Sequence, residues 1–128
     1  MAKWIIPANG KKYDIKAFFE KHDVVDWTKK VGYSNGDIVY IYCSAPEQRV
    51  RYKTIVENDA LPPDQLMDDH EYWPDLKDFE LSRTKEHVRL RLLQTFDSDK
   101  LGLKELKKHG LPIAPQGPFH LSELNSSR

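Results

Sequence analysis

Hydrophobic and polar residues alternate in three stretches of the chain, and each stretch predicts a β-strand. In 38–44 both alternating faces are apolar or aromatic, which predicts a central strand covered on both sides. In 49–57 and 86–96 one face is mostly apolar and the other carries arginines. If these two strands are neighbours, we expect their arginines to form a basic sheet face.

Weaker signals predict the elements around these strands. Residues 3–7 form an apolar segment that we expect to end at Pro7, and 24–27 predicts a short extended piece. Asp14 is a candidate N-cap for a helix over 15–21. A second helix is predicted over 97–110, because acidic and hydroxyl residues begin it and lysines precede its closing glycine.

The segment 58–84 is rich in proline and acids, and it predicts an irregular excursion with one helical turn and a Tyr72-Trp73-Pro74 anchor. Strands and short helices in mixed order argue for an α+β fold around a small, curved or closed sheet. A doubly wound fold is not expected, because strands and helices do not alternate. We expect one domain over 1–122, followed by a flexible tail or linker over 123–128.

Composition narrows the class of protein. The 128 residues suffice for one domain with a buried core. No apolar run approaches the roughly 18 residues of a membrane span, and the apolar stretch at the N-terminus is too short for a signal peptide. The single cysteine, Cys43, excludes an internal disulfide and suits a reducing compartment. We therefore expect a cytoplasmic protein with no membrane partner.

The formal net charge is zero, but the charges are unevenly distributed. Residues 57–80 hold nine acids and one base, so the remainder holds nineteen bases and eleven acids. A solvated surface explains any single charge. Because the chain outside 57–80 has an excess of bases, it could still bind a polyanionic partner.

Signals for catalysis and for metal or cofactor binding are poor. The histidines are scattered, and no pair of them, or of a histidine with Cys43, has the spacing of metal ligands. An acidic loop explains Asp68-Asp69-His70 better than a metal site does, and Cys43 is expected to be a buried structural thiol. The chain has no phosphate-binding glycine loop, dinucleotide fingerprint or serine elbow. We expect no catalytic residues, no metal, no cofactor and no enzyme activity.

A pocket for a flat ring is better supported. Aromatic side chains can form its walls, and amide or hydroxyl groups can contact the polar edge of the ring. Each aromatic alone is more often a core residue, Asn9 could be a turn residue, and Gln116 could face solvent. The candidate wall residues are Trp4, Trp27, Tyr40 and Tyr42, and the candidate polar residues are Asn9, Ser44 and Gln116.

Cations that could contact a phosphate backbone are spread over several segments. The strongest evidence for such contacts is the alternation of arginines in 49–57 and 86–96. The candidates are Lys11, Lys12, Lys29, Lys30, Arg49, Arg51, Arg89 and Arg91, with Lys104, Lys107 and Lys108 in the predicted second helix.

An ordered set of short segments resembles the EVE domains of the PUA-like superfamily. The resemblance is greatest to EVE modules attached to HNH nucleases in modification-dependent restriction systems. It covers nearly the whole chain except the acidic excursion, and it rests on 4–9 with Tyr13-Asp14, Asp26-Trp27, 31–42, Tyr52-Lys53, 97–100 with 106–110, and Gln116-Gly117-Pro118.

The resemblance implies a five- or six-stranded PUA-like barrel with flanking helices. It further implies a pocket for a flipped 5-methylcytosine or 5-hydroxymethylcytosine in DNA, with cleavage left to a separate nuclease domain. By resemblance Trp27 is a pocket wall, the strand end from Tyr42 to Ser44 lines the pocket, and Gln116-Gly117-Pro118 closes it.

The chain departs from this pattern at three points. Gly10 stands where many relatives have proline, the segment 57–80 is unusually acidic, and no HNH motif is present. The chain is therefore expected to be a standalone reader or the excised part of a longer nuclease. An RNA-binding PUA-like module and a protein-interaction module that uses 57–80 remain alternatives, and a small-molecule enzyme comes last.

Overall fold

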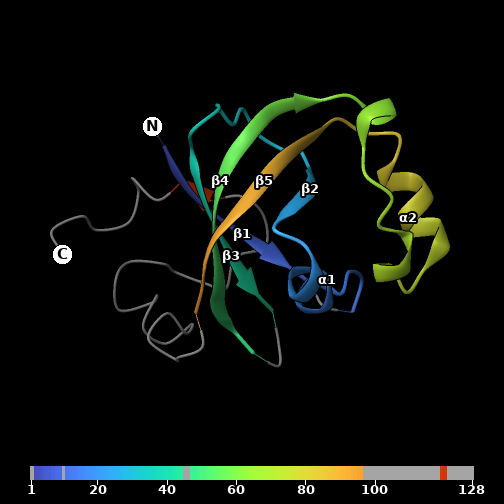
Figure 1. Cartoon of the computed structure of the whole chain (residues 1–128), viewed down its shortest axis with the longest axis horizontal. Coiled ribbons are helices and arrows are strands. Elements are labelled where there is room, and N and C mark those ends of the chain that lie inside the picture. Colours follow the sequence, from blue (N-terminus) through green and yellow to red (C-terminus); the bar gives the residue numbers. More distant parts are fainter. Residues whose placement is uncertain (1, 10, 45–46, 97–118, 121–128) are drawn as a thin grey trace, which may run out of the picture.

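The chain forms one mixed β-sheet with short helices, and the computed structural model describes residues 2–9, 11–44, 47–96 and 119–120. The strands lie in the order β2-β5-β4-β3-β1-β6, with β1 parallel to β3 and the other neighbours antiparallel. Figure 1 shows β4 and β5 curving across the molecule, with both α-helices on the side of β2. The strands are β1 Lys3–Ala8, β2 Val24–Thr28, β3 Ile38–Cys43, β4 Arg49–Leu61, β5 His87–Thr95 and β6 Phe119–His120. The α+β class predicted from the sequence is confirmed.

The central strand is β3, as its two apolar faces predicted. Val39 and Ile41 on one face and Tyr42 on the other are all fully buried. β3 pairs with β1 on one side and β4 on the other, so its backbone groups are satisfied in both directions. The strand therefore fixes the centre of the hydrophobic core.

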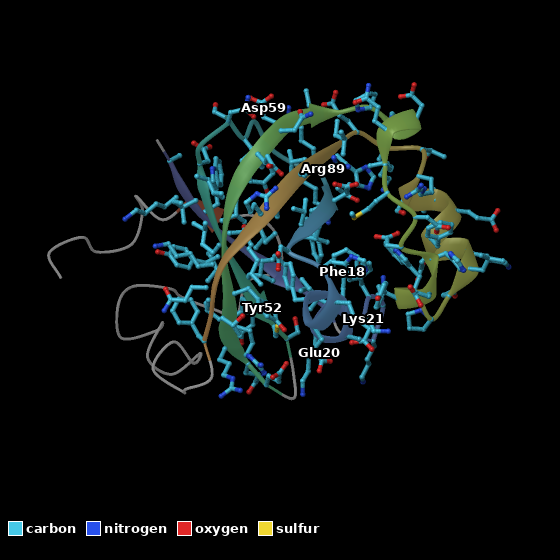
Figure 2. All side chains as sticks on the ribbon, viewed as in Figure 1. Phe18, Glu20, Lys21, Tyr52, Asp59 and Arg89 are labelled. Atoms are coloured by element: carbon cyan, nitrogen blue, oxygen red, sulfur yellow. The ribbon has the colours of Figure 1, made fainter. Side chains whose placement is uncertain are left out.

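Helix α1 (Ile15–Lys21) covers part of this core and begins where the sequence predicted. The Asp14 carboxylate accepts a hydrogen bond from the Ala17 N–H at 3.1 Å, which satisfies one of the free donors of the first turn. Phe18 is buried, whereas Glu20 and Lys21 are exposed on the outer side of the helix (Figure 2). The helix is thus held by one apolar face.

We expected the first strand to end at Pro7, but it does not. β1 continues to Ala8, and Pro7 pairs with Tyr42 in the parallel ladder. The described part of β6 pairs only with Trp4 and Ile5. Proline is compatible with a strand wherever the ladder does not need its missing N–H.

The alternation predicted for 49–57 fails at Arg51. In the β3–β4 ladder Ile41 pairs with Tyr52 and Tyr42 pairs with Val50, so Arg51 is an extra residue in a β-bulge. Val50, Arg51 and Tyr52 are consequently all buried. The bulge therefore turns the Arg51 side chain inward, whereas strict alternation would place it on the outer face.

The excursion 58–84 contains more regular structure than predicted. β4 extends to Leu61, and two 3₁₀ turns, η1 (Pro63–Gln65) and η2 (His70–Tyr72), precede helix α2 (Leu76–Ser82). The Asp75 carboxylate caps α2 by accepting from the N–H groups of Lys77 and Asp78. The predicted helix over 97–110 and the predicted domain end at 122 lie outside the described residues. No helix in the described ranges is long and apolar enough to cross a membrane.

Candidate functional site

A cavity of about 450 Å³ lies between the β1–α1 loop, β2 and the excursion. Its volume falls in the range of small-molecule sites, about 300–1,000 Å³. Aromatic, acidic and basic side chains all reach it. The lining residues are Pro7, Asn9, Lys12, Tyr13, Asp26, Trp27, Thr28, Lys30, Ser44, Asp69, Trp73, Ser82, Arg83 and His87.

Three aromatic rings of the described residues form apolar walls of the cavity. The Tyr13 ring meets Trp27 edge to face at a centroid distance of 5.7 Å and Trp73 at 5.2 Å. Such pairs hold one another in orientation through their quadrupoles. Trp27 and Trp73 are partly exposed, so their remaining ring surface is available to the cavity.

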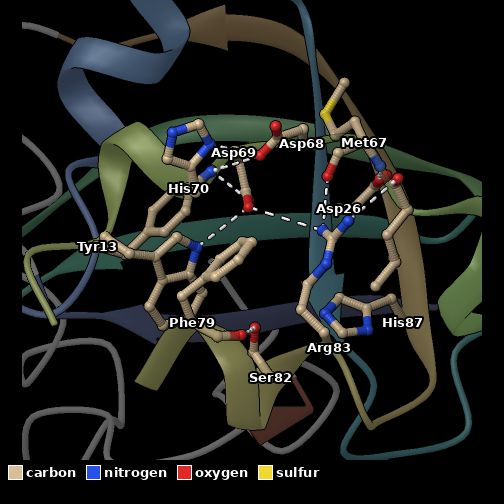
Figure 3. A network of polar contacts seen from close by, with 12 residues as sticks. Tyr13, Asp26, Met67, Asp68, Asp69, His70, Phe79, Ser82, Arg83 and His87 are labelled. Carbon is tan, nitrogen blue, oxygen red and sulfur yellow. Dashed lines mark hydrogen bonds and ion pairs between the residues drawn. The ribbon is translucent and has the colours of Figure 1, made fainter. Parts of the chain in front are cut away.

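A buried carboxylate, Asp69, joins these walls. Its Oδ2 accepts a hydrogen bond from the Tyr13 hydroxyl at 3.1 Å, and its Oδ1 accepts from the Trp73 indole N–H at 3.2 Å. Figure 3 shows Asp69 at the centre of this network, with the Arg83 guanidinium approaching it. Burial raises the pKa of Asp69, and the hydrogen bonds from Tyr13 and Trp73 oppose that rise. Burial, with the nearby Asp69 carboxylate, also raises the pKa of Tyr13, so its hydroxyl stays protonated and remains a donor.

A second buried carboxylate, Asp26 on β2, is paired with a full charge. Arg89 on β5 donates from Nε to Oδ1 at 2.8 Å and from Nη2 to Oδ2 at 3.0 Å. The Met67 N–H also donates to Oδ2, at 2.9 Å. Asp26 therefore has its charge compensated and ties the excursion to the sheet.

Arg83, the C-cap of α2, holds the segment that carries Asp69. Its Nη1 donates to the Met67 carbonyl at 2.6 Å and lies 3.9 Å from Asp69 Oδ1. Its guanidinium also stacks over Phe79, 5.1 Å from the ring centroid. Helix α2 and the 66–69 segment are thus tied together at the cavity wall.

His87 is a buried neutral ring in the same wall. Its Nδ1–H donates to the Lys85 carbonyl at 2.8 Å, since a carbonyl oxygen can only accept. Burial lowers the pKa of His87, although the Lys85 hydrogen bond and the nearby acids oppose the change.

The side chains that line the cavity can offer a ligand acceptors from Asp69 and donors from Lys12 and Lys30. Among the described residues, no group of His, Cys, Asp and Glu side chains could hold a metal ion.

Three of the predicted pocket residues, Asn9, Trp27 and Ser44, line this cavity. The Asn9 side chain also accepts from the Lys11 N–H at 2.9 Å, so its turn role and its place at the cavity coexist. The predicted closing segment, Gln116-Gly117-Pro118, lies outside the described residues.

The other predicted walls lie elsewhere. The Trp4 indole N–H donates to Asp37 Oδ2 at 3.1 Å, and its ring packs edge to face on Tyr33 at 5.3 Å. Tyr42 is buried in the core, and Tyr40 is partly buried on β3; neither lines the cavity. Trp4 and Tyr42 thus belong to the packed core, which was the alternative interpretation of each.

The predicted basic sheet face does not form, although β4 and β5 do pair. Arg89 is bound by Asp26, and Arg91 donates to Glu57 at 2.8 Å. Lys29 lies 3.7 Å from Glu86, Arg49 lies 3.8 Å from Glu47, and the buried Arg51 is also paired with Glu47. Acidic neighbours thus compensate these cations. Lys12 and Lys30 reach the cavity, and Lys11 is exposed beside it.

Sequence reasoning did not assign Tyr13, Asp26, Asp69, Trp73, Arg83 and His87 to the pocket. Tyr13 and Asp26 were in the segments that carry the EVE resemblance, and Trp73 was expected as an anchor. Asp69 looked like one of many solvated acids, because only tertiary contacts place it under Tyr13 and Trp73. Cys43 is buried as predicted, and burial raises its pKa to about 12.

The arrangement of strands and helices matches known structures. No family model matches the chain, and no curated protein matches it. The ASCH protein of Zymomonas mobilis superposes with a TM-score of 0.64 at 15% identity, over 94% of this chain and 87% of that one. A Pseudomonas putida protein from structural genomics gives 0.57 at 20% identity, over 91% and 86%. Human THYN1, in complex with DNA that contains 5-methylcytosine, gives 0.53 at 13% identity, over 84% and 74%.

The fold is PUA-like. This confirms the fold that the EVE resemblance implied. At these identities the likeness establishes the fold alone. The narrower assignment to EVE modules of HNH-type nucleases stays a prediction.

Proposed function

We propose that this chain is a non-catalytic nucleic-acid-binding module that takes one flipped, modified base of DNA into the cavity beside Trp27. The base is 5-methylcytosine or 5-hydroxymethylcytosine, and the module supplies specificity to a modification-dependent restriction system. The observation that carries the proposal is the cavity itself. It has the volume of a small-ligand site, partly exposed indole rings and buried polar groups on its walls.

The energetics of this cavity suit an extruded base. Extruding a base from a duplex costs a few kcal/mol. Stacking on an aromatic ring returns about 1–3 kcal/mol per base. Trp27 and Trp73 both expose ring surface at the cavity, and the remaining stabilisation would come from hydrogen bonds to the edge of the base.

Two further observations support the proposal. Lys12 and Lys30 reach the cavity from separate loops, where they could contact the phosphates that flank an extruded nucleotide. The PUA-like fold is also that of THYN1, whose structure was solved with 5-methylcytosine-containing DNA.

The acidic excursion fits this proposal better than it fits a separate docking surface. Asp69 and Trp73 of the excursion line the cavity, and Arg83 holds the 66–69 segment in place. Deleting 60–80 would therefore remove a wall of the base pocket. The excursion therefore forms part of the pocket whether or not it also binds a partner.

The test is binding to matched duplexes that differ at one cytosine, which is plain, 5-methylated or 5-hydroxymethylated, at moderate salt. We expect a preference of about tenfold or more for one modified duplex, equivalent to about 1.4 kcal/mol. Equal, strongly salt-sensitive binding would contradict base recognition. Tighter binding to the ribose form of the same sequence would favour RNA instead.

A pair of tryptophan variants makes the test specific to the cavity. Trp27→Ala is expected to abolish the preference for the modified base, because it removes a stacking wall. Trp4→Phe is the matched control, since Trp4 packs on Tyr33 and bonds to Asp37 outside the cavity. A Trp27→Ala variant that keeps the full preference would refute the pocket assignment.

A further inference from the structure

We propose that Asp69 is the residue that selects the base: it accepts a hydrogen bond from the exocyclic amino group of a 4-aminopyrimidine and so excludes thymine and uracil. The inference rests on the proposed function, because it assigns a role within the same cavity. It adds the chemical feature of the base that is recognised and the side chain that recognises it.

The first step is the unused acceptor capacity of Asp69. A carboxylate offers about four lone-pair positions to donors. Two side chains among the described residues donate to this carboxylate, Tyr13 to one oxygen and Trp73 to the other, and the backbone N–H of Asp69 contributes as well. Asp69 is a lining residue of the cavity although it is only 5% exposed. Its remaining lone pairs therefore suit a donor that enters the cavity.

The second step separates Asp69 from Asp26, the other buried acid among the described residues that line the cavity. Asp26 receives three hydrogen bonds, two of them from the guanidinium of Arg89. Within the described part of the chain, the cation that pairs with Asp69 is Arg83, whose Nη1 lies 3.9 Å away and donates instead to the Met67 carbonyl at 2.6 Å. Asp69 is thus the less compensated carboxylate, and a donor from a ligand stabilises it more.

The third step is the difference between the two methylated pyrimidines. 5-Methylcytosine and thymine have the same ring and methyl group, but position 4 carries an amino group in one and a carbonyl in the other. An amino N–H can donate to Asp69, as acidic side chains accept from cytosine N4 in other complexes. A carbonyl would set two acceptors against each other in a buried site, and the carbonyl would have no donor there.

The experiment uses single-stranded oligonucleotides, so that pairing energy does not differ between bases. One position carries 5-methylcytosine, thymine or 5-methylpyrimidin-2-one, which lacks the 4-amino group. The wild-type chain is expected to bind the 5-methylcytosine strand at least tenfold more tightly than either of the others. This arm needs no variant, so it does not depend on how a substitution folds.

Asp69→Asn then tests the residue. The amide keeps the shape and one acceptor for Tyr13 or Trp73, but it presents a donor that can satisfy a 4-carbonyl. We expect the ratio of 5-methylcytosine to thymine affinity to fall toward one. Asp64→Asn, an exposed acid of the same excursion, is the charge-matched control and should leave the ratio unchanged.

The outcomes distinguish the two proposals. If the wild type prefers 5-methylcytosine to cytosine but binds the thymine and amino-free strands equally well, the role of Asp69 is refuted and base recognition stands. The same holds if a folded Asp69→Asn variant keeps the full ratio. If no modified cytosine is preferred in any strand, the proposed function itself fails.

Discussion

Arg89 and Asp26 form a two-pronged ion pair that crosses from β5 to β2, with hydrogen bonds of 2.8 and 3.0 Å. The residues are direct partners in the antiparallel ladder, so the sheet register brings them together. The Asp26 side chain is 3% exposed and that of Arg89 is 30% exposed. The pair explains why an arginine that sequence alternation assigns to a DNA-binding face serves the fold instead.

Arg89→Ala is expected to lower the free energy of unfolding by about 3 kcal/mol, because it leaves a buried carboxylate without its cation. Arg91→Ala is the control on the same strand. Its partner Glu57 is exposed, so the loss should be about 0–1 kcal/mol. Urea denaturation of the two variants measures the difference. Equal losses would mean that burial of Asp26 is not what makes the Arg89 pair important.

Lys12 and Lys30 should account for part of the salt dependence of DNA binding. Replacing both with alanine removes two phosphate contacts, and each contact contributes about 0.9 to the slope of log K against log salt. We expect the slope to become less steep by about two, with the preference for the modified base retained.

The matched control for this prediction replaces Lys16 and Lys21, which are exposed on α1 away from the cavity lining. This variant changes the net charge by the same amount. Titrations at several salt concentrations measure both slopes. If the two double variants changed the slope equally, only the overall charge would matter, and the cavity rim would have no special role.

His87 should make stability depend on pH below neutrality. Burial lowers its pKa below the ordinary value of 6.5, so between these two values the unfolded chain binds more protons than the folded one. The contribution of neutral His87 to the free energy of unfolding is therefore complete above pH 6.5, and it is lost as the pH falls toward the pKa of the folded state. Asp69 acts in the opposite sense, because its raised pKa favours proton uptake by the folded chain.

Comparison with His87→Gln isolates the histidine from these other groups. Thermal unfolding between about pH 5 and 7 should show a smaller loss of stability in the variant than in the wild type. Parallel pH profiles of the two proteins would show that His87 does not titrate differently on folding.

Gly36 is expected to resist substitution for a backbone reason alone. Its φ is +91°, and a Cβ built there would contact nothing within 4 Å. Gly36→Ala should therefore cost about 1–2 kcal/mol through strain. Gly32 has the same open space without a positive φ, so Gly32→Ala should be neutral or slightly stabilising. Equal effects on unfolding would contradict this explanation.

Local patterns in the chain were enough to locate the central strand and the first helix. Two apolar faces predicted a buried β3, and the Asp14 cap placed the start of α1 correctly. Both features depend on neighbours along the chain. The bulge at Arg51 was not predictable in this way, because it arises from how β4 pairs with β3.

At the candidate site, too, some features could be predicted from local sequence and others could not. Trp27, Asn9 and Ser44 were predicted and do line the cavity, whereas Trp4, Tyr40 and Tyr42 do not. A core aromatic and a pocket aromatic have the same local pattern, so spacing alone cannot separate them.

By itself, the sequence determined the class of fold, the central strand and the aromatic and polar residues from which a pocket could be built. Tertiary structure decided which charges remain available: it bound Arg89 to Asp26 and placed Asp69 beneath Tyr13 and Trp73. The physical reason is that the properties of a charged group depend on burial and on partners distant in sequence. Sheet register and the path of the excursion set both.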